Sequence, residues 1–113
     1  MRSSRFLVPI LLLIFLAACG IEVPLTQSAY VGRWEADGMF LLITRDGSVA
    51  YRRFRKGAST KIQAPLKAFH GDDFEVGIGP MTTTFKVSSP PREVDGVWRM
   101  TVDGVELTRV VRR

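Results

Sequence analysis

The side chains in this sequence that could act as a general base or as metal ligands gather around a single histidine. His70 is the only histidine, and three acidic residues follow it closely: Asp72, Asp73 and Glu75. An imidazole and carboxylates can bind a metal ion, but His70 and Asp72 flank a predicted turn, and no second histidine is present to complete the set. Solvated turn residues are the simpler interpretation. We therefore expect no metal site and no cofactor.

Nucleophilic side chains occur together at Ser59, Thr60 and Lys61. A hydrolase of the serine type needs a nucleophile, a base and an orienting acid held in contact. Nothing in the sequence pattern brings these residues next to His70. The sequence therefore predicts no catalytic residue, and we expect a protein that is not an enzyme.

The remaining reactive group is the thiol of Cys19, the only cysteine, which cannot form an internal disulfide. It follows an apolar block at residues 6–18, and Arg2 and Arg5 precede that block without any acidic residue. A helix that spans a membrane needs about 20 apolar residues, so this block is too short. A basic start, an apolar stretch and small residues are typical of a cleaved secretory signal, which we predict at residues 1–18.

Leu16-Ala17-Ala18-Cys19 resembles the lipobox of bacterial lipoproteins. The resemblance implies that diacylglycerol is attached to the sulfur of Cys19, that the chain is cut before it, and that the new amino group is acylated. Several acyl chains give a stable membrane anchor. Gly20 stands where enteric bacteria read aspartate as a signal for the inner membrane. The resemblance therefore implies the outer membrane, facing the periplasm.

The 113 residues allow one small domain after the signal. We predict a signal peptide at 1–18, the lipidated cysteine and a tether at 19–29, and a β domain at 30–113. Removing the signal takes two of the 16 basic residues and none of the 11 acidic ones, leaving a net charge of +3. This small excess and the predicted export argue against a nucleic-acid partner.

Short runs of β-branched and aromatic residues, separated by glycine-containing turns, predict about eight strands. We expect them at residues 31–36, 39–45, 48–55, 60–69, 74–78, 82–87, 97–102 and 105–111. Asp46-Gly47 predicts a two-residue hairpin. Pro65 indicates an edge, a bulge or two shorter strands, and Pro90-Pro91 indicates a loop at residues 88–92. The only helical signal is a single turn at residues 26–30, capped by Thr26 or Ser28.

Consecutive hairpins favour an all-β, up-and-down antiparallel meander. A flat sheet of this size would leave two long open edges, so we expect a closed or partly closed barrel, with a β-sandwich as the alternative. Trp34 and Trp98 are predicted to be largely buried.

Gly32-Arg33-Trp34 resembles the Gly-x-Trp signature of lipocalins and related calycin barrels. The resemblance implies that Trp34 plugs one end of a barrel, with Arg109 or Arg112 over its ring. The chain is shorter than lipocalins and lacks their terminal helix, and the alternative is an ordinary core tryptophan at the start of a strand. Residues 30–110, with Gly79-Pro80-Met81 and the closing stretch at 100–109, are also similar to uncharacterised small proteobacterial lipoproteins, which implies no activity.

Four positive charges lie close together at Arg52, Arg53, Arg55 and Lys56. In an exported protein this pattern predicts contacts with an anionic component of the envelope or with an envelope protein. Strand geometry places Arg53 and Arg55 on one face and Arg52 on the other. The alternative is a solvated strand end whose charges protect an edge from pairing with other chains.

These observations favour a membrane-anchored, non-enzymatic binding or interaction module. Two alternatives remain open: a structural or assembly accessory of the envelope without a ligand, and an inhibitor of a hydrolase. The single cysteine counts against the inhibitor, because small secreted inhibitors are usually rich in disulfides.

Overall fold

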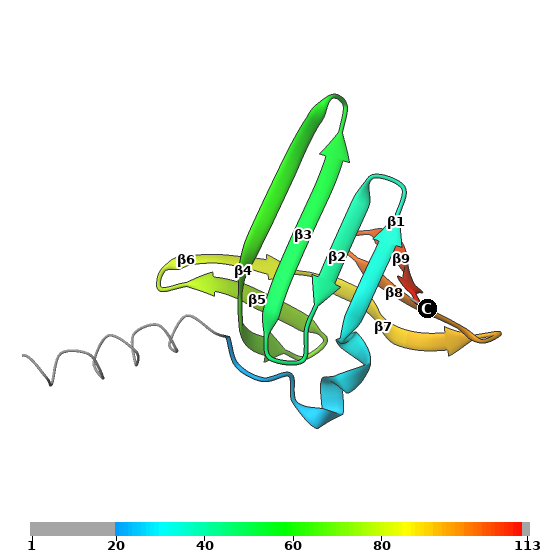
Figure 1. Ribbon diagram of the computed structural model, residues 1–113, viewed down its shortest axis with the longest axis horizontal. Helices are drawn as coiled ribbons and strands as arrows, with labels where there is room; N and C mark the ends of the chain where they lie inside the picture. The colour runs from blue at the N-terminus through cyan, green and yellow to red at the C-terminus, as the bar shows by residue number, and fades with distance from the viewer. Residues whose placement is uncertain (1–19, 112–113) are drawn as a thin grey trace, which may run out of the picture.

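The structure, a computed structural model, describes residues 20–111 of the chain (Figure 1). One antiparallel sheet of nine strands follows a short 3-10 helix, η2 (Leu25–Tyr30). The strands are β1 (Gly32–Ala36), β2 (Met39–Ile43), β3 (Ser48–Arg55), β4 (Ala58–His70), β5 (Asp73–Ile78), β6 (Met81–Phe85), β7 (Val87–Val94), β8 (Val97–Val102) and β9 (Val105–Val110). The predicted all-β fold class is confirmed, with one strand more than expected.

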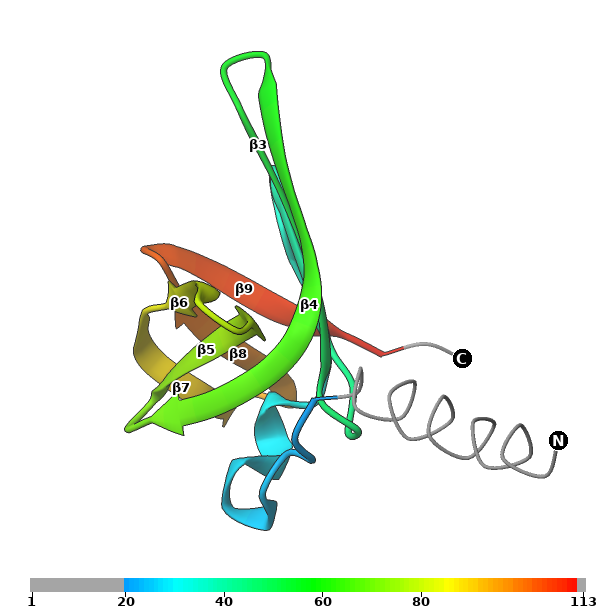
Figure 2. The ribbon, with the colours of Figure 1, turned by 90° about the vertical axis from the view of Figure 1, so that its left-hand side faces the viewer.

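The strand order is β6-β5-β4-β3-β2-β1-β9-β8-β7, an up-and-down meander in which the pairing of β1 with β9 joins the two ends of the chain. The sheet curls into a half-barrel (Figure 2). We call the end that carries the β3–β4 and β8–β9 turns the tip end, and the opposite end, with the β2–β3 loop, the base.

Two aspartates hold the curl where β6 runs into β7, with only Lys86 between the two strands. The backbone N–H of Lys86 donates to Oδ1 of Asp103 (2.9 Å), and that of Val87 donates to Oδ1 of Asp73 (2.7 Å). The backbone N–H of Asp103 in turn donates to the carbonyl of Lys86 (2.7 Å). The two edge strands are thus continuous in sequence, and carboxylates replace the strand pairing that is missing at their junction.

Alternation along the strands fills the concave face with apolar side chains. Phe74 and Val76 in β5 are buried, whereas Ile78, at the end of this strand, is 69% exposed. The rings of Phe74 and Phe85 stack with their centroids 5.0 Å apart. The buried core consists of Val23, Tyr30, Trp34, Met39, Leu41, Ile43, Val49, Tyr51, Leu66, Phe74, Val76, Phe85, Val87, Met100, Val102 and Leu107.

The loop predicted at residues 88–92 was wrong, because these residues lie within β7. In the described sheet β7 is an edge strand, and its register against β8 shifts between Val87 and Ser89 and again between Ser89 and Arg92. An edge strand with bulges tolerates prolines, since their missing N–H groups leave no gap in a ladder. Pro90-Pro91 therefore does not end the strand.

The two-residue hairpin predicted at Asp46-Gly47 was also wrong, because four residues separate β2 from β3. Thr44 N–H donates to the carbonyl of Ser48, and Gly47 N–H donates to the carbonyl of Thr44, both at 3.0 Å. Of the Asp46-Gly47 pair, only Gly47 has a positive φ, +90°. Two-residue turns with both φ values positive occur instead at Lys56-Gly57, Asp95-Gly96 and Asp103-Gly104.

The described part of the predicted tether lies against the base of the sheet. The backbone N–H of Val23 donates to the carbonyl of Arg45 (3.0 Å), and the side chain of Val23 is buried. Gly20 packs so closely that a Cβ atom would lie 2.3 Å from the carbonyl oxygen of Gly47. Packing alone is therefore a sufficient reason for glycine at position 20, independently of the sorting argument.

The helix η2 begins after Pro24, and no side chain caps it, so the predicted cap by Thr26 or Ser28 was wrong. Its last residue, Tyr30, is 4% exposed, and its carbonyl accepts a hydrogen bond from Nε1 of Trp34 (2.9 Å). The helix thereby fixes the start of β1 at the base of the sheet.

Tyr30 should make stability fall at alkaline pH. Its hydroxyl donates to the carbonyl of Asp72 (2.8 Å), and burial, then the charges of Asp72 and Asp73, raise its pKa from 10.0 to about 12. The folded chain holds the phenol proton more tightly than the unfolded chain, so this contribution is complete below pH 10 and is lost as the pH rises to about 12. Urea unfolding between pH 10 and pH 12 should show that the free energy of unfolding falls more steeply with pH for the unmodified chain than for Tyr30→Phe. Equal slopes would contradict the assignment, and Tyr51→Phe serves as the control.

Candidate functional site

The four cations predicted to contact an anionic partner lie at the end of β3 and in the turn that follows. Arg53 and Arg55 point to the concave side with Tyr51, whereas Arg52 lies on the convex side, as strand geometry indicated. Lys56 forms the turn to β4, with a φ of +46°. The structure therefore brings together two of the four predicted residues, at the tip end of the half-barrel.

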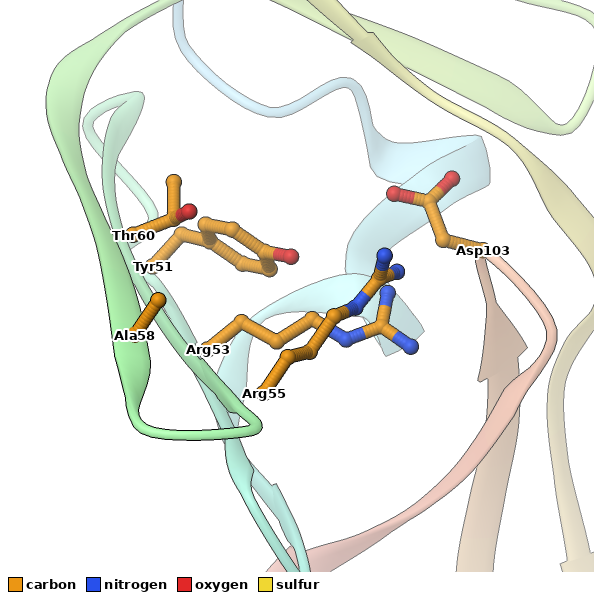
Figure 3. A pocket seen from close by; sticks show the side chains of 6 residues that line it. All are labelled: Tyr51, Arg53, Arg55, Ala58, Thr60 and Asp103. Carbon is orange, nitrogen blue, oxygen red and sulfur yellow. The ribbon is translucent and has the colours of Figure 1, made fainter.

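Arg53 and Arg55 reach into a cleft between the β3–β4 hairpin and the β8–β9 turn. The cleft has a volume of about 360 Å³ and is lined by Tyr51, Arg53, Arg55, Ala58, Thr60 and Asp103 (Figure 3). Both guanidinium groups extend toward Asp103, and the hydroxyl of Tyr51 points into the same space. The side chains that β4 contributes are small, which leaves the guanidinium groups accessible.

The electrostatics of this cleft favour an anion. Among residues 20–111, neither arginine forms an ion pair, and Oδ1 of Asp103 already accepts the backbone N–H of Lys86. The guanidinium groups of Arg53 and Arg55 therefore keep donors for another acceptor. Their planar sets of N–H groups match the oxygens of phosphate and carboxylate. With two cations facing one anion, the cleft has a net positive charge.

The hairpin around the cleft reinforces this charge. Residues 48–70 contain six lysine and arginine residues and no aspartate or glutamate. Such a single-sign surface attracts anions over about a Debye length, roughly 8 Å at physiological salt. The acidic residues lie outside this hairpin: Asp103 faces it across the cleft, and several others form ion pairs such as Arg92–Glu106 (2.9 Å).

At the base of the sheet, Arg109 lies between two tryptophans. Its Cζ atom is 5.8 Å from a ring centroid of Trp34 and 4.9 Å from that of Trp98. Trp34 is fully buried, and Trp98 is partly buried against the core, so the predicted burial is complete for Trp34 and partial for Trp98. The pair Trp34 and Arg109 is thus in contact, while its function as a barrel plug stays a prediction.

The glycine of the Gly-x-Trp segment has a local structural cause. Gly32 has a φ of +143°, and a Cβ atom there would lie 2.8 Å from Cδ of Arg109. Glycine therefore lets the arginine stem cross the start of β1 and reach Trp34. The close approach of Arg109 therefore explains why glycine stands two residues before Trp34, without reference to any family.

His70 and its acidic neighbours do not form a compact site. Nε2 of His70 lies 3.0 Å from Oε1 of Glu75, and hydrogen bonds from His70 and then Thr82 hold the pKa of Glu75 below its usual value. Within the described residues, no three histidine, cysteine or acidic side chains are arranged to hold a metal ion. The interpretation as solvated turn residues was wrong for Asp73, whose carboxylate binds the backbone at the start of β7.

Sequence reasoning missed several residues of the cleft and of its support. Asp103 stands in an Asp-Gly turn, and no local signal in the sequence shows that it faces Arg53 and Arg55 across the half-barrel. Ala58 and Thr60 line the cleft because the register pairs them with Arg55 and Arg53. That pairing follows from the Lys56-Gly57 turn and could have been read from the sequence.

Several predictions fall outside the described residues. The signal peptide at 1–18, the lipidation site Cys19 and the alternative plug residue Arg112 all lie there and stay predictions. Between residues 20 and 111, no helix is long and apolar enough to cross a membrane. No protein-family model, curated protein or solved structure matches the chain.

Proposed function

We propose that this protein is an outer-membrane lipoprotein, anchored through Cys19 and facing the periplasm, whose half-barrel is a non-enzymatic binding module for an anionic group. The observation that carries the binding proposal is the cleft in which Arg53 and Arg55 converge opposite Asp103. The anchor is supported by the lipobox and the preceding apolar block.

The chemistry of the cleft suits a phosphate group. Two guanidinium groups on one side of a small space can share the oxygens of a doubly charged anion through charge-assisted hydrogen bonds. Arg55 is exposed and Arg53 half-buried, so each contact contributes only about 0–1 kcal/mol. Binding should therefore be modest and should weaken as ionic strength rises.

Replacing both Arg53 and Arg55 by serine should reduce anion binding by about tenfold, since two exposed charge contacts are lost. The measurement is calorimetric titration of the full-length chain, in a non-ionic detergent, with pyrophosphate and separately with lipopolysaccharide. Binding of both probes points to the phosphate itself, and binding of lipopolysaccharide alone points to its surrounding glycolipid.

The matched control is the double replacement of Arg52 and Lys56 by serine, which removes the same charge from outside the cleft. It should leave binding within about twofold of the unmodified chain, because long-range attraction is screened by salt. An equal loss in both double variants would mean that net charge, and not the cleft, attracts the anion. Unchanged binding of the cleft variant, together with new aggregation, would assign the charges to solubility.

The filled interior favours a second candidate, an assembly accessory that uses its surface only. Trp34, Leu41, Phe74 and Phe85 are almost completely buried on the concave side, where a carrier of apolar ligands would need space. Failure of both anionic probes to bind would favour this candidate.

A further inference from the structure

The tip half of β4 has an outer edge without a neighbouring strand. Residues 58–65 pair with β3 on one side, and β5 pairs with β4 only from Leu66 onward. Figure 1 shows the tip of the β3–β4 hairpin rising beyond the rest of the sheet, with no strand on the outer side of β4, and Figure 2 shows the same projection from the side. Among the described residues, no strand adjoins this edge.

The register determines which backbone groups face outward along this edge. Leu66 N–H donates to the carbonyl of Gly47 (2.7 Å), and Phe54 N–H donates away from β4, to the carbonyl of Gly38 (2.8 Å). Because hydrogen-bonded and non-hydrogen-bonded pairs alternate in an antiparallel ladder, Ser59, Lys61 and Gln63 direct their N–H and C=O groups outward. Each of these three residues is exposed.

Pro65 follows the same alternation. It occupies the next outward-facing position after Gln63, where an N–H would not take part in the β3–β4 ladder. The strand thus carries a proline without losing a hydrogen bond to β3, and the proline marks the end of the pairing-competent edge.

We propose that the outer edge of β4, from Ala58 to Pro65, binds an extended acidic segment of another protein as an added strand. Strand addition obtains its affinity from main-chain hydrogen bonds and its specificity from side chains at alternate positions. The proposal is independent of an anion in the cleft, because its hydrogen bonds come from the backbone of β4.

Charge decides which occupant the edge fits. On the convex side an added strand would lie next to Lys61, whose partner across β3 is Arg52. On the concave side the added strand would lie next to Ala58 and Thr60. These residues are small, and their partners in β3 are Arg55 and Arg53. Acidic side chains therefore find cations on both sides of the added strand.

A second copy of the chain fits this edge poorly. Edge-to-edge pairing of two copies would place one hairpin without acidic residues beside another, with Lys61 near Lys61. Like charges directly opposite each other destabilise a strand pair. The same charges that prevent self-pairing select an acidic partner.

The test uses the full-length chain in a non-ionic detergent and a fluorescent peptide of alternating glutamate and valine, long enough to span the edge. We expect saturable binding that weakens with salt, and at least about tenfold weaker binding of the same peptide N-methylated along its backbone, because it lacks the required donors. A peptide with lysine in place of glutamate should not bind.

Gln63→Pro removes an outward-facing N–H, and its ring blocks an added strand at this position. It changes neither the charge of the chain nor the hydrogen bonds between β3 and β4. It should weaken peptide binding about tenfold, whereas Gln63→Thr, the matched control, should not. Equal binding of the N-methylated peptide, or unchanged binding by a folded Gln63→Pro chain, overturns the proposal. If the chain associates with itself and Gln63→Pro abolishes this self-association, the edge binds a second copy of the chain. This result would also overturn the proposal. The Arg53 and Arg55 variants, titrated with pyrophosphate, report on the cleft separately.

Discussion

Trp34→Ala should lower the free energy of unfolding by about 3–5 kcal/mol, the usual range for deleting a fully buried aromatic side chain. Trp34 is 0% exposed, and its ring and Nε1 tie together β1, the end of η2 and the stem of Arg109. Domains of this size are typically stable by about 5–15 kcal/mol, so the variant should be close to unfolding at physiological temperature. Urea unfolding monitored by far-ultraviolet circular dichroism measures the change.

The matched control is Trp98→Ala, which removes the other ring that contacts Arg109. Trp98 is only partly buried, so its removal should be less destabilising than that of Trp34. Equal losses for the two variants would show that Arg109, and not the burial of Trp34, dominates the base of the sheet. An unchanged stability of Trp34→Ala would contradict the described core.

The second large effect concerns the predicted anchor. Mass spectrometry of the membrane fraction should find a chain that begins at Cys19 and carries a diacylglycerol thioether on that residue. Cys19→Ser should lose the adduct and the cleavage completely, because serine offers no thiol for lipid transfer. Several acyl chains make the anchor effectively permanent, so the expected difference is all or none.

A second variant controls for the mere presence of a thiol. Cys19→Ser combined with Ser28→Cys keeps one cysteine, at an exposed position in η2 outside the lipobox. It should also lack the lipid. Lipid on the relocated cysteine, or a Cys19→Ser chain that still starts at residue 19 and partitions fully into membranes, would exclude the lipoprotein assignment.

Local patterns were sufficient for most of the fold. Runs of β-branched and aromatic residues between glycine-containing turns were sufficient to predict most of the strands. Pro65 correctly indicated an edge, because an outward-facing position tolerates a missing N–H. The same residue type misled at Pro90-Pro91, where bulges in an edge strand accommodate both rings. Whether proline ends a strand depends on its neighbours in the sheet, which the sequence does not display.

The site was predictable only in part, for a similar reason. The division of Arg52 from Arg53 and Arg55 follows from the two-residue period of a strand. The convergence of Arg55 and Asp103 depends on the curl of the whole sheet. The carboxylate of Asp103 accepts a hydrogen bond from Lys86, which lies 17 residues away in the sequence. The local sequence already explains Asp103 as part of an Asp-Gly turn, so nothing in it indicates this distant contact.

The docking of Gly20 and Val23 against the base has a consequence for orientation. With lipid on Cys19, the adjacent residue Gly20 is already packed beside Gly47, so little slack separates the domain from the leaflet that holds it. In the proposed lipoprotein, the base of the sheet would then face the bilayer. Arg55 lies seven residues along β3 from Ser48, about 23 Å away at the rise of a strand.

This separation exceeds the Debye length of roughly 8 Å at physiological salt, so in the proposed arrangement salt would screen the cationic tip from the headgroups of the leaflet that holds the anchor. In the proposed outer-membrane arrangement, Arg53 and Arg55 would therefore point away from the membrane and into the periplasm. An anion bound by these arginines would then reach them from the aqueous side, on a macromolecule other than the lipids beside the anchor.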